Sequence, residues 1–288
     1  EGRSRADELR LLGRGDLSEA EQKQLADVRA KQNGLRAIES RLTREPPAFV
    51  LGVDVNGNGR AIIASGNPDT AVNVATFVPG TGANLGGVGG LIDRSDRMLG
   101  AAANAGSPST AVITWVGYDA PQDLLQAGDA KYADKARGDL DRFQDGLRAT
   151  HEGAPSHNTV VGHSYGTTVI GHTAHENVLN VDDVVFVGSP GVGVRHASDL
   201  NLPPGHVHAT VAEHDAITVT NPPPPFLDPH GPSPASPGFG ADVFASDPGT
   251  RGPWWAGGRS FEAHSQYWDQ NNTSLVNMGL IIAGRPAH

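Results

Sequence analysis

The sequence contains no cysteine, and this absence excludes disulfide bridges, thiolate metal sites and a cysteine nucleophile. It also contains no run of about 18 or more apolar residues, so we expect no membrane-spanning helix. Lysine and arginine (22) are outnumbered by aspartate and glutamate (32), and the formal net charge of -10 argues against binding to nucleic acid or to an anionic membrane surface. The 288 residues, 38% of them hydrophobic, predict one large domain with a real core.

The first 47 residues are expected to form a separate helical segment. Ser18 and Glu21 make a capping box, and Leu35, Ile38 and Leu42 recur at helical spacing before two prolines end the pattern. This apolar stripe either packs on the main domain or serves a helical partner; a solvated helix is the alternative. The chain begins at Glu1 without a signal-like apolar region, so we expect a piece trimmed from a longer protein, and the compartment stays open between cytoplasmic and exported.

Residues 48–288 predict an α/β domain, because strand-like and helical patterns alternate. We expect a mostly parallel sheet with an antiparallel hairpin at its N-terminal edge, turned by residues 56–59, and helices on both faces. The stretch 221–258, which is rich in proline, has no clear helix or strand and predicts a functional or mobile loop. Strands are expected at 49–54, 60–66, 71–78, 111–118, 159–162, 183–189 and 206–212, and helices near 86–105, 131–150, 165–178 and 265–284.

The most informative segment is TVVGHSYGTT at residues 159–168. A short β-branched run leads into GHSYG, and a helix-compatible segment follows. This is the G-x-S-x-G nucleophile elbow, a sharp strand-to-helix turn that lifts one serine out of a sheet. Glycines at both flanks suit a strained backbone next to a close neighbour. The pattern therefore favours Ser164 as a nucleophile, and the alternative is a turn that is glycine-rich only for packing.

A serine nucleophile needs a base to take its proton and an acid to orient that base. On this kind of elbow the partners follow along the chain as acid, then histidine. Asp215 is the best acid because it follows the strand 206–212 at its C-terminal end, and Glu213 and Asp199 are in reserve. Among the 12 histidines, chain order and position favour His264, just after the long loop, with His230 as the alternative base.

Two backbone N–H groups are needed to stabilise the oxyanion. We expect one from Tyr165, which follows the nucleophile, and the other from Thr81 in the loop Pro79-Gly80-Thr81-Gly82; an ordinary glycine-rich turn is the alternative. His172 and His175 have the spacing of a metal pair, but no third ligand is positioned near them. The sequence therefore predicts no metal and no cofactor.

Several further stretches, in order along residues 49–284, resemble a bacterial α/β-hydrolase family designated as a domain of unknown function. The resemblance implies the α/β-hydrolase fold, a triad of Ser164, Asp215 and His264, and helical segments ahead of the hydrolase domain. It implies no substrate. The stretches that carry it are FVPGTGANLGGVGG, WVGYDAP, DLDRFQDGLRATHEG, PSHNTVVGHSYGTTVIGH, DDVVFVGSPGVGV, AEHDAI and HSQYW.

These observations predict a serine hydrolase that cleaves small-molecule or lipid-like carboxylic esters through an acyl-enzyme. An amidase, a peptidase or an acyl transferase on the same triad is one alternative, and a non-catalytic module that keeps the fold as a partner-binding surface is another. The segment between Val187 and His206 is too short for a large helical lid. We therefore expect an open or loop-covered site, with Trp254 and Trp255 as candidate walls, that prefers short acyl chains.

Overall fold

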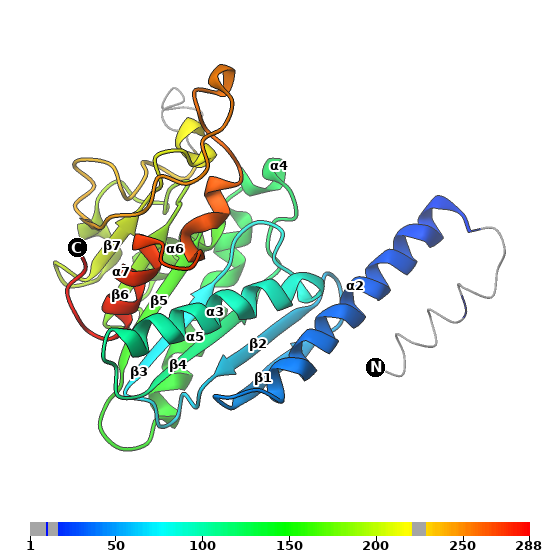
Figure 1. Ribbon diagram of the computed structural model, residues 1–288, viewed down its shortest axis with the longest axis horizontal. Helices are drawn as coiled ribbons and strands as arrows, with labels where there is room; N and C mark the ends of the chain where they lie inside the picture. The colour runs from blue at the N-terminus through cyan, green and yellow to red at the C-terminus, as the bar shows by residue number, and fades with distance from the viewer. Residues whose placement is uncertain (1–9, 11–16, 221–228) are drawn as a thin grey trace.

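The computed structural model describes residue 10, residues 17–220 and residues 229–288, and within them eight strands form one sheet (Figure 1). The strand order is β1-β2-β4-β3-β5-β6-β7-β8. The pairs β1–β2 and β2–β4 are antiparallel, and every other pair is parallel. The predicted mostly parallel sheet with an antiparallel N-terminal edge is confirmed. The strands are β1 (Ala48–Asp54), β2 (Arg60–Ser65), β3 (Asn73–Val78), β4 (Thr110–Val116), β5 (His157–His163), β6 (Asp183–Val187), β7 (Val207–Thr210) and β8 (Asp242–Val243).

Helices cover both faces of the sheet, as predicted. Side chains alternate between faces along a strand, so Val160 and Val184 pack in the core shared with α5 and α6, whereas Val161 and Val185 pack in the core shared with α3 and α7. No helix in the described ranges is both long enough and apolar enough to span a membrane. The α-helices are α2 (Glu19–Leu42), α3 (Val88–Asn104), α4 (Leu124–Ala127), α5 (Lys131–Thr150), α6 (Tyr165–Glu176) and α7 (Thr273–Ile282). The 3-10 helices are η1 (Leu85–Gly87), η2 (Ala197–Leu200), η3 (Ala216–Thr220), η4 (Trp254–Ala256) and η5 (Ala263–Trp268).

Two predicted segments differ from the structure. The last helix, expected at 265–284, is divided into η5 and α7, because Asn272 begins a new helix by accepting a hydrogen bond from the Ser274 N–H. The stretch expected to lack regular structure contributes β8 and η4. Its residues 221–228 lie outside the described residues.

The helix α2 docks along the β1 edge of the domain, where it contacts η1 and α3 (Figure 1). The predicted capping box of Ser18 and Glu21 is present. Ile38 is buried, whereas Leu42 is 41% exposed. Arg41 is also buried and pairs with Asp96 on α3 at 2.9 Å. The apolar stripe therefore packs on the main domain over part of its length. Residues 1–9 and 11–16 of the expected helical segment lie outside the described residues, and the domain boundary at 47/48 stays a prediction.

Candidate active site

Ser164 lies at a strained turn between β5 and α6. Its backbone has φ 53° and ψ -130°, a left-handed conformation that is uncommon for any residue other than glycine. The Ser164 N–H donates to the Val187 carbonyl at 3.0 Å, which ties the turn to β6. A Cβ at Gly166 would lie 2.1 Å from the Val78 carbonyl oxygen, so only glycine fits there. The strand, turn and helix of a nucleophile elbow are all present.

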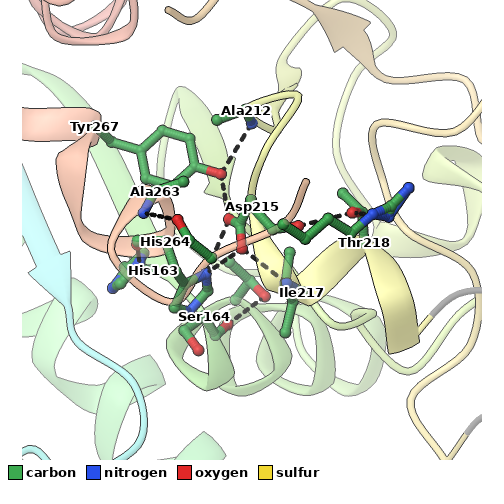
Figure 2. Close-up of polar contacts among 12 residues, drawn as sticks. His163, Ser164, Ala212, Asp215, Ile217, Thr218, Ala263, His264 and Tyr267 are labelled. Atoms are coloured by element: carbon green, nitrogen blue, oxygen red, sulfur yellow. Dashed lines mark hydrogen bonds and ion pairs between the residues drawn. The ribbon is translucent and has the colours of Figure 1, made fainter. Parts of the chain in front are cut away.

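Asp215 and His264 form a hydrogen-bonded pair beside this turn (Figure 2). The His264 Nδ1 lies 2.9 Å from both carboxylate oxygens of Asp215. Asp215 is fully buried and accepts two more hydrogen bonds, from the Tyr267 hydroxyl at 2.5 Å and from the Ile217 N–H at 2.8 Å. A carboxylate only accepts hydrogen bonds, so the proton of neutral His264 sits on Nδ1 and Nε2 is left as the basic atom.

Ser164 and His264 line the same cavity, whose volume is about 1030 Å³. In the view of Figure 2 the His264 side chain lies between Asp215 and Ser164. Over the described ranges, no hydrogen bond joins the Ser164 hydroxyl to His264. Hydrogen bonds between catalytic groups are often long or poorly aligned before a substrate binds. The missing bond between Ser164 and His264 is therefore compatible with proton transfer between them.

His163, next to the serine, fixes the main chain of His264. The His163 Nε2 donates to the His264 carbonyl at 2.8 Å, and the two rings lie 4.7 Å apart. The carbonyl can only accept, so His163 Nδ1 carries no proton and faces the Arg94 guanidinium at 3.4 Å. Burial, with His264 and Arg94 nearby, lowers the pKa of His163 well below its usual value. His163 is therefore a neutral support for His264.

The loop expected to hold the oxyanion lies directly against the elbow. A Cβ at Gly80 would lie 2.8 Å from the Tyr165 nitrogen, so the glycine allows this close approach. The loop is held by hydrogen bonds from the Gly82 N–H to Pro121 and from the Tyr118 hydroxyl to Pro79, both at 2.7 Å. Thr81 lines the cavity. Within the described part of the chain, neither the Thr81 nor the Tyr165 N–H donates a hydrogen bond, so both stay candidate oxyanion donors.

The other histidines that the sequence suggests as candidates make contacts outside the triad. His230 is buried, its ring lies 5.5 Å from that of Tyr165, and its Nε2 contacts the Ala127 carbonyl. The Nδ1 atom of His172 contacts Asp134, and that of His175 contacts the Asp199 carbonyl. Among the described residues, no cluster of three or more histidine, aspartate or glutamate side chains is arranged so that it could hold a metal ion.

Three contributors to the site could not be found in the sequence. Tyr267 holds the acid, and Arg94 and Arg259 line the cavity. None of them belongs to a motif with a defined spacing, because their roles depend on which elements meet in the fold. Trp255, a predicted wall, also lines the cavity. Trp254 is 88% exposed and is not among the lining residues.

Comparisons with known proteins agree with this architecture. A family model described as an alpha/beta hydrolase matches residues 54–225. The chain is 36% identical over 191 residues to the uncharacterized protein Rv2079 of Mycobacterium tuberculosis, covering 60% of this chain and 28% of that protein. It is 33% identical over 199 residues to the uncharacterized protein Mb0988c of Mycobacterium bovis, covering 65% of this chain and 74% of that protein. The chain thus spans less than a third of the length of the first relative.

Solved esterase structures are also similar. Esterase LipW from Mycobacterium marinum is 12% identical, with 94% of this chain and 92% of that chain covered and a TM-score of 0.49. An arylesterase is 13% identical, with 90% of each chain covered and the same TM-score of 0.49. The family match covers more than half of the sequence and carries the elbow with it. The chain therefore belongs to the alpha/beta hydrolase family.

Proposed function

We propose that this protein is a serine hydrolase that cleaves carboxylic esters. The observation that carries the proposal is the Asp215–His264 pair at 2.9 Å, which opens onto the same cavity as the strained Ser164. A nucleophile, a base and an orienting acid in this arrangement are the groups that acyl transfer requires. The order along the chain is also that of this fold.

Each residue has a separate role in the proposed reaction. His264 Nε2 takes the proton of the Ser164 hydroxyl as its oxygen attacks the ester carbonyl. The Thr81 and Tyr165 N–H groups stabilise the resulting oxyanion. His264 then returns the proton to the leaving alcohol, and an acyl group stays on Ser164. Water, activated by the same histidine, releases the acid. Asp215 stays ionised throughout and stabilises the imidazolium.

Labelling with a fluorophosphonate tests the proposal directly, because this probe reacts with an activated serine. We expect one label per chain, on Ser164, and hydrolysis of p-nitrophenyl esters. Ser164→Ala should abolish both while the protein stays folded. Ser246→Ala, outside the cavity, is the matched control and should retain both. An inert wild-type protein would contradict the proposal and favour a binding module, and a label on another serine would contradict the assignment of Ser164.

A further inference from the structure

Two arginines line the cavity that holds Ser164 and His264, and neither pairs with an acid within the part of the chain that the structure describes. Arg94 comes from α3, and Arg259 lies just ahead of η5. Across residues 17–220 and 229–288, neither guanidinium forms an ion pair, and no aspartate or glutamate lines the cavity. The whole chain has a net charge of -10. The cavity of the candidate active site therefore carries positive charge, whereas the protein as a whole is negative.

Arg94 contacts the residue that precedes the nucleophile. Its Nη1 lies 3.4 Å from the Nδ1 of His163, the residue before the nucleophile. Its guanidinium carbon lies 4.6 Å from the centre of the Trp268 ring, which orients the group by a cation–π contact. A guanidinium has five N–H donors, and the contact with neutral His163 occupies one of them.

The positive charge of Arg94 is not paired with an anion among the described residues. Burial, with Arg97 nearby, lowers the pKa of Arg94 and outweighs the opposing effect of the Asp269 charge, so the surroundings disfavour the charged form. A guanidinium withdrawn from water is costly unless an anion pairs with it. Arg94 is thus oriented by the protein but left without an anion.

Arg259 adds a second positive charge to the same cavity. Its Nη1 donates to the Thr218 hydroxyl at 2.7 Å, a neutral partner that leaves the charge uncompensated. Two arginines and no acid favour a negatively charged ligand over a neutral or cationic one. The planar fork of arginine binds a carboxylate through two parallel N–H···O bonds.

We propose that the substrates are esters whose acyl part carries a second, free carboxylate, and that Arg94 binds this carboxylate. This inference rests on the proposed function, since it names the substrate class for the same site. The reaction converts a hemiester of a dicarboxylic acid and water into the dicarboxylic acid and the alcohol. The acyl part stays on Ser164 through both half-reactions, so its pairing with Arg94 would assist both.

Binding to the Ser164→Ala protein tests the carboxylate site without any turnover. The probes are monomethyl adipate and dimethyl adipate, measured by isothermal titration calorimetry. We expect the monoester to bind roughly tenfold or more tightly, as for a charge-assisted pair. Adding Arg94→Gln should remove most of that difference. Arg142→Gln, which removes the same charge from the α5 surface outside the cavity, should preserve it. Equal affinities for the two probes, or a difference that survives Arg94→Gln, would overturn the proposal.

Arg94→Lys covers the case in which the glutamine variant does not fold, as judged by its melting temperature. Lysine keeps the charge and loses the planar fork, so an intermediate preference for the monoester is expected. An unchanged preference for the monoester in a folded Arg94→Lys protein would count against a bidentate site at Arg94.

Turnover separates the failure of this inference from the failure of the proposed function. The substrates are mono-p-nitrophenyl adipate and p-nitrophenyl hexanoate, which share a six-carbon acyl chain. We expect Arg94→Gln to lower kcat/KM for the adipate roughly tenfold to a hundredfold more than it lowers kcat/KM for the hexanoate. Hydrolysis of both without discrimination would remove the inference alone. Selective binding with no hydrolysis of either ester would remove the proposed function alone.

Discussion

The Tyr267 hydroxyl donates to Asp215 Oδ2 at 2.5 Å and accepts from the Ala212 N–H at 3.0 Å. Burial, with the Asp215 charge beside it, raises the pKa of Tyr267, so the hydroxyl stays protonated and remains a donor at neutral pH. Asp215 is thus held on one side by η5, through Tyr267, and on the other by the backbone of η3, through Ile217. The acid of the candidate triad has little freedom to move away from His264.

Tyr267→Phe should destabilise the protein by about 1–3 kcal/mol, because the Ala212 N–H loses its acceptor in a buried site. The loss of kcat on p-nitrophenyl acetate should be smaller than that of any triad variant, since Ile217 and His264 still bind Asp215. Urea denaturation and steady-state kinetics on the same preparation check both parts. A wild-type free energy of unfolding would show that the Tyr267 contact is dispensable.

Asp215→Asn should lower kcat by roughly 10²–10⁴, because the asparagine amide can donate to His264 and favour the wrong tautomer. Glu213→Gln, two residues earlier on the exposed side of the turn, is the matched control and should retain activity. Steady-state kinetics with p-nitrophenyl acetate compare the two variants. An equal loss in Glu213→Gln would transfer the role of acid to Glu213.

His264→Ala should reduce activity as severely as loss of the serine, since triad members act as a unit. His230→Ala should leave most activity in place, because the Nε2 of His230 contacts the Ala127 carbonyl and His230 is not among the residues that line the cavity. Measuring kcat/KM for both variants decides between the two candidate bases. Activity lost in His230→Ala and kept in His264→Ala would show that the base is misassigned.

The sequence points to Ser164, Asp215 and His264 as candidates because its signals for them are local. The elbow, the acid after β7 and the histidine after the long loop each follow from a strand end and a motif. The strand β8 was missed because two residues, Asp242 and Val243, carry no detectable alternation. Arg94 and Tyr267 were missed for another reason. Each acts across a contact between distant segments, Arg94 with His163 and Tyr267 with Asp215, and no spacing in the chain encodes such a contact.

Asp183, at the opposite ends of the strands from Ser164, should make stability depend on pH. Its carboxylate contacts His157 at 2.8 Å, His208 at 2.9 Å and His206 at 3.2 Å. The Asp183 hydrogen bond raises the pKa of His157. Burial opposes ionisation of Asp183, but hydrogen bonds from His157 and His208 outweigh it and lower the pKa of Asp183.

The pKa shifts of His157 and Asp183 determine how the stability of the protein changes with pH. The raised pKa of His157 adds stability below about pH 6.5 that is lost as the pH rises through the folded-state value. The lowered pKa of Asp183 adds stability above about pH 4 that is lost on acidification. Asp183→Asn should therefore cost on the order of 1 kcal/mol more near pH 6 than near pH 9. Urea denaturation at both pH values measures this difference. The kcat of the variant is the control, because Asp183 is remote from the candidate active site. A cost that does not change with pH would contradict it.

Short-chain p-nitrophenyl esters should be hydrolysed faster than long-chain ones, without a jump in rate above the critical micelle concentration. Between β6 and β7 the chain forms only η2, four residues long, so no helical lid there can open onto a lipid surface. A series from acetate to palmitate, measured across the micelle threshold, checks both parts. Peak activity on long chains, or interfacial activation, would instead indicate a lipase.

Three side chains that line the cavity also face solvent, and this affects how the cavity can change during evolution. Leu124, Trp255 and Phe261 line the cavity, yet they are 67%, 74% and 70% exposed. Substitutions at exposed positions usually change the free energy of unfolding by less than about 0.5 kcal/mol. Single mutations at these positions can therefore change the entrance of the cavity with little effect on the free energy of unfolding. Paralogues that share the same elbow can be expected to differ first at these three positions.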